Sequence, residues 1–250
     1  MPLRIGFDMD GVLADMVSAY KEVEARLFGP VEAKDDTPEE PDGPAALDEA
    51  RAREAGPHDK SHDDTEADAK EKAAELKTLR VKREIVWRAV ESTENFWTTL
   101  KPLDAGAVTR LANLARRHRW DVFFLTQRPE TAGESTQRQT QRWLVAQGFD
   151  LPSVIVVRGS RGKVAAALEL DYLVDDTPKN CVDVKAESPS TRSILIMEKH
   201  DLPAEKNARW LGIAVTRSVS AALDLLEEAQ AARNSPTLWE KLARSVGWQG

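Results

Sequence analysis

Two aspartates stand two residues apart, directly after a short apolar stretch at the start of the chain. Asp8 and Asp10 follow residues 3–7 (Leu-Arg-Ile-Gly-Phe), and Gly11 comes next. A buried strand that runs into two carboxylates needs a compensating charge, and a divalent cation with a phosphate beside it is the best candidate. The same Asp-x-Asp-Gly pattern is also an ordinary turn signal. The rest of the chain must decide between these two interpretations.

Further polar residues follow other stretches that are predicted to be strands. In an open parallel sheet, ligands bind outside the carboxyl ends of the strands, so we expect these residues to gather at one edge. They are Thr126 and Gln127 after residues 122–125, Lys163 in the helix after residues 154–157, and Asp175 and Asp176 after residues 172–174.

Short apolar stretches alternate with amphipathic ones from residue 102 onward, which is typical of a parallel sheet covered on both faces. The predicted strands are 3–7, 122–125, 154–157, 172–174, 194–197 and 213–215, and the predicted helices are 104–117, 134–147, 162–169, 218–231 and 236–245. Two more amphipathic stretches, 14–28 and 67–91, come before them. The predicted fold class is α/β, a doubly wound parallel sheet with a small helical cap inserted after the first strand.

The polar set has a coherent chemical use in the transfer of a phosphoryl group. Asp8 can attack phosphorus and form an aspartyl-phosphate, while Asp10 can protonate the leaving oxygen and later deprotonate water. Mg²⁺ prefers oxygen ligands, which Asp8, the carbonyl of Asp10, and either Asp175 or Asp176 would supply. Thr126, Gln127 and Lys163 are the predicted phosphate-binding residues, and Lys163 would add a cation for the transition state.

The ordered set resembles the four motifs of the haloacid dehalogenase-like superfamily of phosphohydrolases. The corresponding residues are Asp8-x-Asp10-Gly11-Val12, Thr126, Lys163 and Asp175-Asp176. The resemblance covers most of residues 1–220 and implies a Rossmann-like core and dependence on Mg²⁺. An aspartate at position 10 is what the phosphatases of the superfamily have and its dehalogenase branch lacks.

A narrower resemblance is to the 5'(3')-deoxyribonucleotidases. The opening from Asp8 to Asp15 is similar, and so is the aromatic stretch around Phe96 and Trp97 before the second motif. In that family an aromatic wall holds the nucleobase, so Met16, Phe96 and Trp97 are candidate wall residues here, although Met16 stands where the family has an aromatic residue. Packing of Phe96 and Trp97 into the core is the alternative.

Arg128 departs from the family pattern, because Gln127 and Arg128 stand where a small residue and a proline are expected. Arg128 either binds a second anionic group of the substrate or pairs with a neighbouring acid. The substrate could therefore be a nucleoside monophosphate, a sugar phosphate or another small phosphorylated metabolite.

The acidity of the chain is concentrated in one segment. The net charge is −7, and residues 31–75 hold sixteen Asp and Glu against six Lys and Arg. Segment 31–66 is too poor in apolar residues to offset its ordering entropy, so we interpret it as a disordered acidic insertion that could recruit a basic partner. His58 and His62 lie there among aspartates, either as a metal site or, more simply, as part of a solvated polar tract.

These features define an expected organisation. The catalytic core comprises residues 1–13 and 98–232, the cap 14–30 and 67–97, the acidic insertion 31–66, and a C-terminal helix and tail 233–250. A binding module on a phosphatase fold is the alternative to an enzyme. No membrane span, secretory signal or basic nucleic-acid footprint is recognised, and a single cysteine, Cys181, fits a cytoplasmic location.

Overall fold

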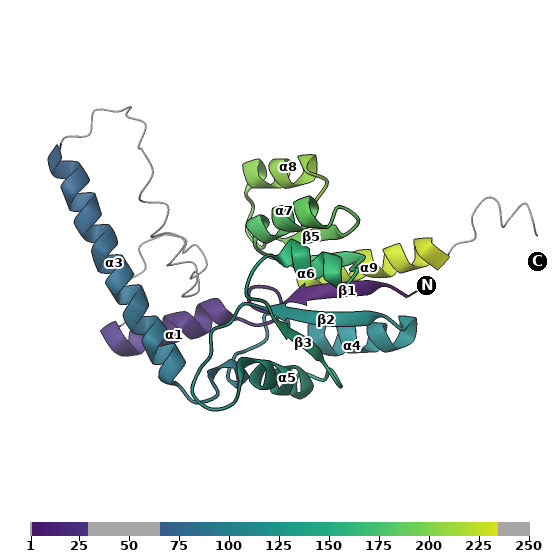
Figure 1. Ribbon diagram of the computed structural model, residues 1–250, viewed down its shortest axis with the longest axis horizontal. Coiled ribbons are helices and arrows are strands. Elements are labelled where there is room, and N and C mark those ends of the chain that lie inside the picture. The colour runs from purple at the N-terminus through teal and green to yellow at the C-terminus, as the bar shows by residue number, and fades with distance from the viewer. Residues whose placement is uncertain (1, 30–65, 235–250) are drawn as a thin grey trace, which may run out of the picture.

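A parallel sheet of six strands lies at the centre of the computed structural model, which describes residues 2–29 and 66–234 (Figure 1). The strands are β1 (Arg4–Asp8), β2 (Asp121–Thr126), β3 (Ser153–Val156), β4 (Tyr172–Asp175), β5 (Arg192–Ile196) and β6 (Ala214–Thr216). Their order across the sheet is β3-β2-β1-β4-β5-β6. Each predicted strand is present within a few residues, and the doubly wound α/β fold is confirmed.

Helices cover both faces of the sheet. On one face lie α4 (Ala107–His118), α5 (Thr136–Ala146) and α9 (Val219–Asn234), and on the other α6 (Arg161–Ala167), α7 (Pro178–Glu187) and α8 (Leu202–Trp210). The sequence did not predict α7 and α8. Both carry a proline in the first turn, where its missing N–H costs nothing. The helix predicted at 236–245 lies outside the described residues.

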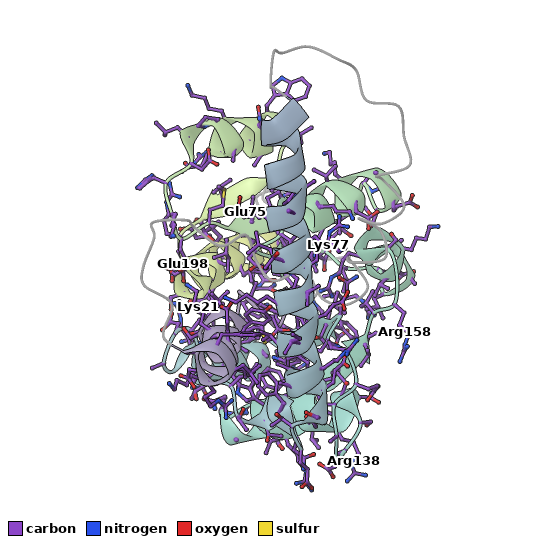
Figure 2. The ribbon with its side chains drawn as sticks, turned by 90° about the vertical axis from the view of Figure 1, so that its left-hand side faces the viewer. Lys21, Glu75, Lys77, Arg138, Arg158 and Glu198 are labelled. Atoms are coloured by element: carbon purple, nitrogen blue, oxygen red, sulfur yellow. The ribbon has the colours of Figure 1, made fainter. Side chains whose placement is uncertain are left out.

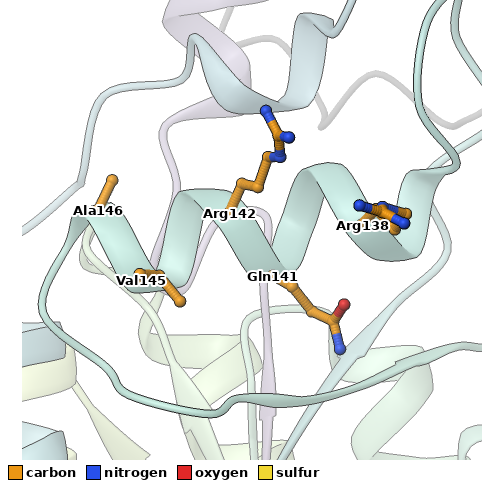
Figure 3. A pocket seen from close by; sticks show the side chains of 5 residues that line it. All are labelled: Arg138, Gln141, Arg142, Val145 and Ala146. Atoms are coloured by element: carbon orange, nitrogen blue, oxygen red, sulfur yellow. The ribbon is translucent and has the colours of Figure 1, made fainter.

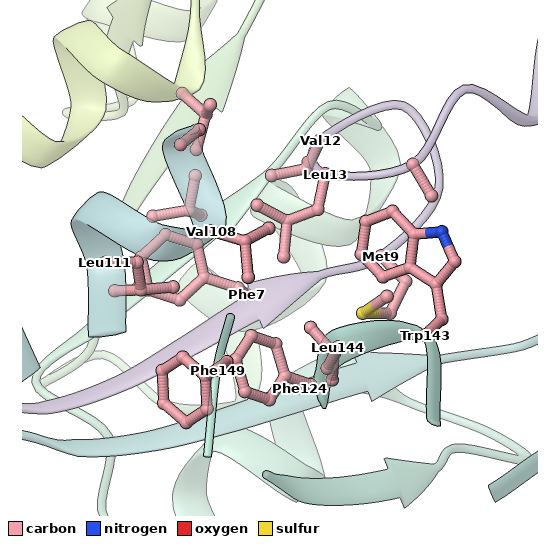
Figure 4. Close-up of a cluster of buried hydrophobic side chains, with 14 of the residues drawn as sticks. Phe7, Met9, Val12, Leu13, Val108, Leu111, Phe124, Trp143, Leu144 and Phe149 are labelled. Carbon is pink, nitrogen blue, oxygen red and sulfur yellow. The ribbon is translucent and has the colours of Figure 1, made fainter. Parts of the chain in front are cut away.

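The larger hydrophobic core fills the face beneath α4, α5 and α9 (Figure 4). Phe7 and Phe124, from the neighbouring strands β1 and β2, are completely buried. Phe124 packs edge-on against Phe149, with the ring centroids 4.8 Å apart. Such close packing fixes the register of the strands, and the register in turn determines which residues meet at the strand ends.

Between β1 and α4 the chain forms two helices beside the sheet, α1 (Met16–Phe28) and α3 (Glu66–Ser92), followed by the short 3₁₀ helix η1 (Phe96–Thr98). The rings of Tyr20 and Trp87 join α1 to α3 at a centroid distance of 5.7 Å. Helix α3 continues well past this contact and bears Glu75 and Lys77 on its surface (Figure 2). The acidic residues 31–65, including His58 and His62, lie outside the described part of the chain.

None of the helices in the described ranges combines the length and apolar character that crossing a bilayer requires.

Candidate active site

The carboxyl ends of β1, β2 and β4 bring the predicted residues into register. Asp8 pairs with Leu125 of β2, which places Thr126 one residue further along. On its other side β1 pairs with β4 so that Asp8 and Asp175 occupy equivalent positions. Strands β2 and β3 lie on one side of β1 and the later strands on the other, which makes this edge the switch point where open α/β sheets bind ligands.

Asp8 is buried against a guanidinium group. Arg161 Nη2 donates a hydrogen bond to Asp8 Oδ1, and Arg161 Nε lies 3.7 Å from Asp175 Oδ2. The Arg161 side chain is only 3% exposed. Its Nε and Nη1 atoms are buried and make no hydrogen bond within the described residues. Buried donors of this kind are costly unless a ligand satisfies them, and a phosphoryl group offers the acceptor oxygens that they lack.

The basic side chain that contacts Asp8 in the structure is Arg161, whereas the sequence suggested Lys163 as the cation. Helix α6 begins at Arg161, after Ser160, whose Oγ accepts the Lys163 N–H at 3.0 Å. Arg161 therefore occupies the first helical position and reaches the strand ends. The Lys163 side chain lies two residues further around the helix and is exposed. Gly162 is needed between them, because a Cβ there would lie 2.4 Å from the Asp183 carbonyl oxygen of α7.

Asp175 and Asp176 follow β4 and differ in their surroundings. Asp175 is completely buried, and its Oδ1 accepts the Thr177 N–H at 2.9 Å and Asn180 Nδ2 at 3.1 Å. Asp176 is partly exposed. These hydrogen bonds fix the Asp175 carboxylate beside Arg161 and Asp8.

The carboxylates at this edge fit a magnesium ion in their chemistry. Within residues 2–29 and 66–234, no three His, Cys, Asp or Glu side chains are gathered closely enough to form a metal site by themselves. Mg²⁺ does not require this, since it usually binds one or two carboxylates, keeps several waters and takes further ligands from substrate phosphate. Asp8, the Asp10 carbonyl and Asp175 or Asp176 are the residues that would hold it.

Thr126 is the last residue of β2 and Gln127 follows it, and the two side chains have different environments. Thr126 is buried, and its Oγ1 accepts the Arg128 N–H at 3.2 Å. Gln127 is exposed, and its Nε2 donates to the Gly159 carbonyl at 3.2 Å, linking the loop after β2 to the loop before α6. Both residues thus lie at the predicted edge, and Gln127 contacts the loop that presents Arg161.

Asp10 lies just beyond β1 and is held by Arg128. Gly11 follows with a φ of 75°, a conformation that favours glycine and turns the chain sharply after Asp10. Two nitrogens of Arg128 donate to the Asp10 carboxylate. Of the two roles considered for Arg128, pairing with a neighbouring acid is the one that the structure shows.

The candidate wall residues are packed inside the protein. Met16, Phe96 and Trp97 are 6%, 3% and 1% exposed and belong to the main hydrophobic cluster. The rings of Phe96 and Trp97 meet edge-on at a centroid distance of 5.1 Å. In this structure they therefore take the packing role and do not line an open pocket.

A hollow of about 280 Å³ is lined by Gly11 and Val12, the two residues that follow Asp10. Asp104, Glu198 and Ser218 contribute polar groups to it. A second hollow lies on the outer surface of α5, along Arg138, Gln141, Arg142, Val145 and Ala146 (Figure 3). The second hollow belongs to one helix, whereas the first is lined by the residues that follow Asp10 and by Ile196, which ends β5, so the first is the better placed to receive a ligand.

Comparison with solved structures places this arrangement among known folds. A phosphonoacetaldehyde hydrolase-like protein from Oleispira antarctica aligns with a TM-score of 0.50 at 14% identity, over 94% of this chain and 95% of that one. A haloacid dehalogenase-like family hydrolase from Streptococcus pneumoniae (TM-score 0.47, 10% identity, 90% and 98% covered) and a β-phosphoglucomutase-type protein from Thermotoga maritima (TM-score 0.47, 16% identity, 90% and 99% covered) are also similar. At this identity the similarity shows the fold alone: the chain has the α/β fold of the Oleispira antarctica protein. No protein-family model and no curated protein sequence matches the chain.

This fold explains why the motifs appear in the order seen in the sequence, each at the end of a strand. The residues that sequence reasoning missed are Arg161 and Asn180. Arg161 had a signal: it is the first residue after the capping pattern Gly159-Ser160, and the first position of a helix at a strand end faces the ligand. Asn180 had none, because α7 itself was not predicted.

Proposed function

We propose that this protein is a Mg²⁺-dependent phosphomonoesterase that acts through an aspartyl-phosphate on Asp8. The observation that carries the proposal is the buried Asp8 carboxylate at the switch point, in contact with an arginine that has two buried N–H groups left over. Nucleophile, anion-binding cation and oxygen ligands for a hard metal thus lie at one edge of the sheet.

In the first step an Asp8 oxygen forms a bond to phosphorus while the bond from phosphorus to the ester oxygen breaks. Asp10 gives its proton to the departing oxygen, which leaves as an alcohol. In the second step Asp10 takes a proton from water, whose oxygen attacks phosphorus and releases inorganic phosphate from Asp8. Thr126 and Arg161 bind the phosphoryl oxygens, and the positive charge of Arg161 stabilises the negative charge that develops on them.

When bound, Mg²⁺ would neutralise negative charge between the carboxylates and the phosphate and so permit their close approach. Asp8, Asp10 and either Asp175 or Asp176 are its ligands in this proposal. The Oleispira neighbour is named as a phosphonoacetaldehyde hydrolase-like protein, and a hydrolase on the same fold agrees with a hydrolytic role here.

The substrate in this proposal is a small phosphate ester. The sequence resemblance to deoxyribonucleotidases favours a nucleoside monophosphate, but the burial of Met16, Phe96 and Trp97 gives the base no aromatic wall in this structure. A sugar phosphate or another small metabolite phosphate is the rival substrate, and the polar hollow beside Gly11 suits it.

The test is phosphate release from p-nitrophenyl phosphate and from a panel of nucleoside monophosphates and sugar phosphates, with Mg²⁺ or with EDTA. We expect release that needs Mg²⁺ and disappears in Asp8→Asn, a variant that keeps the shape of the side chain. Release that persists in Asp8→Asn would exclude the covalent mechanism. An absence of release from every ester, with Mg²⁺ binding shown by calorimetry, would favour the binding-module alternative.

A further inference from the structure

Arg128 donates hydrogen bonds to both carboxylate oxygens of Asp10, the candidate acid and base of the site. We call this pair of hydrogen bonds the Arg128 fork. Its Nε donates to Asp10 Oδ2 at 2.8 Å, and its Nη2 donates to Asp10 Oδ1 at 2.7 Å. A guanidinium that binds both oxygens of a carboxylate fixes the plane of that carboxylate as well as its position. Asp10 keeps 23% of its side chain exposed, so one side of the held carboxylate still faces outward.

The guanidinium of Arg128 is itself held on its remaining sides. Its Nη1 donates to Thr140 Oγ1 of α5 at 3.1 Å, and its Cζ lies over the ring of Trp97 at 4.9 Å from the centroid. The Arg128 side chain is only 1% exposed. Because the side chain is buried and each of its three nitrogens already donates to a protein group, Arg128 is poorly placed to bind an anionic group of the substrate.

Trp97 is fixed in turn by the loop that follows β2. Its Nε1 donates to the Pro129 carbonyl at 3.0 Å, and its backbone N–H donates to Gln139 Oε1 at 3.1 Å. The ring comes from η1, where the chain returns from α3 to the sheet. The direction of the Arg128 fork is therefore set by three separate elements: η1, α5 and the loop after β2.

From this geometry we propose that Arg128 is a positioning residue that aims the Asp10 carboxyl group at the ester oxygen. The inference rests on the proposed phosphomonoesterase function and assigns to it a residue that makes no contact with the substrate. A flexible aspartate beside a turn has two side-chain torsions, and the fork restricts both. Efficient proton transfer depends on such alignment.

The test uses two esters that differ in how much they need a proton donor. The alcohol released from 2,4-dinitrophenyl phosphate is strongly acidic and leaves without protonation, whereas glycerol 2-phosphate releases an alkoxide unless a proton is supplied. In Arg128→Lys, which keeps the charge but loses the fork, kcat/KM for glycerol 2-phosphate should fall at least about tenfold. For 2,4-dinitrophenyl phosphate it should stay within about threefold of wild type, because kcat/KM reports the phosphorylation of Asp8.

A second variant tests the same role if Arg128→Lys does not fold properly. Thr140→Val removes the acceptor of Arg128 Nη1 and leaves both Asp10 and Arg128 in place, so it should show the same selective loss with a smaller amplitude. Arg138→Lys is the matched control, since Arg138 is an exposed arginine on the same helix α5. Melting temperatures of all three variants, compared with wild type, report folding independently of activity.

The outcomes separate the inference from the function on which it rests. Equal losses on both esters, or no loss on either, in Arg128→Lys and Thr140→Val would overturn the positioning role while leaving the phosphatase intact. A wild-type enzyme that hydrolyses neither ester would instead remove the proposed function itself.

Discussion

Arg161 Nη2 donates a hydrogen bond to Asp8 Oδ1, so the basic side chain in contact with Asp8 comes two residues before Lys163, the cation that the sequence suggested. The contact joins the first turn of α6 to the end of β1, across a sequence separation of 153 residues. It places a fixed positive charge at the atom that would attack phosphorus.

Replacing Arg161 and replacing Lys163 should therefore have unequal effects on catalytic activity. Arg161→Met should lower kcat/KM for p-nitrophenyl phosphate by about 100-fold or more, the size expected for loss of one donor to a developing oxyanion. Lys163→Met should remain near wild type, because its side chain is exposed at the surface. Steady-state kinetics measure kcat/KM for both variants. A larger loss in Lys163→Met than in Arg161→Met would restore Lys163 as the phosphate ligand.

Removing the metal should abolish turnover without unfolding the protein. The core beneath α4, α5 and α9 is held together by apolar side chains, so EDTA should leave the circular dichroism spectrum unchanged while activity is lost and then restored by Mg²⁺. Asp175→Asn or Asp176→Asn should raise the Mg²⁺ concentration that gives half-maximal activity. The larger rise identifies the direct ligand, and activity that resists EDTA in the wild type would contradict a metal requirement.

Replacing Asp10, the candidate acid and base, should make the aspartyl-phosphate on Asp8 accumulate. In Asp10→Asn the transfer to Asp8 from 2,4-dinitrophenyl phosphate needs no proton donor, but hydrolysis of the aspartyl-phosphate has lost its base. We expect a rapid burst of about one dinitrophenolate per active site, followed by slow turnover. Stopped-flow absorbance measures the burst. Steady-state turnover at the wild-type rate would remove Asp10 from both steps.

Strand positions and strand-end polar residues could be predicted because they depend on local pattern. An apolar run such as residues 122–125 followed by Thr126 shows where a buried strand ends, and the parallel arrangement then places Asp8, Thr126 and Asp175 at one edge. These inferences need only the repeat of the backbone and the order of the elements.

Side-chain partners could not be predicted in the same way. Whether Arg161 or Lys163 reaches the strand ends depends on the residue at which α6 begins. Sequence periodicity does not resolve this difference of two residues, and the capping residue Ser160 is the only local indication of it. The pairing of Arg128 with Asp10 spans 118 residues and requires the three-dimensional course of two loops. The burial of Trp97 likewise depends on how η1 meets α5.

Cys181 should be chemically inert in the folded protein. It is fully buried in α7, and burial raises the pKa of its thiol, with the nearby carboxylates of Asp175 and Asp176 acting in the same direction. The thiolate that reacts with disulfide reagents is therefore scarce. Ellman's reagent should label Cys181 only after denaturation, and Cys181→Ser should keep wild-type activity. Rapid labelling of the native protein would show that the interior around α7 opens.

A pH-dependent contribution to stability should come from Asp171, which ties the last helix to the first strand. Its carboxylate accepts from both terminal nitrogens of Arg233 in α9 and from the Arg4 backbone N–H of β1 at 2.8 Å. Burial by itself raises the pKa of Asp171, but the hydrogen bonds from Arg233 and Arg4 outweigh it, and the pKa lies below its usual value. The folded state therefore favours the ionised form, and the resulting stabilisation is present above the unfolded pKa of about 3.9.

Asp171→Asn should accordingly lower the free energy of unfolding at pH 7 by about 1 kcal/mol, a modest value because both partners are partly exposed. As the pH falls from about 4 through the lower pKa of the folded carboxylate, this stabilisation is progressively lost, so the difference between the two proteins should shrink. Urea unfolding at pH 7 and at pH 3 measures the difference. Arg192→Gln is a suitable control, because Arg192 begins β5 at the same end of the sheet and its side chain donates to the Tyr172 hydroxyl at 3.4 Å, a neutral partner. A gap between wild type and Asp171→Asn that stays constant with pH would show that the effect comes from packing and not from the charge.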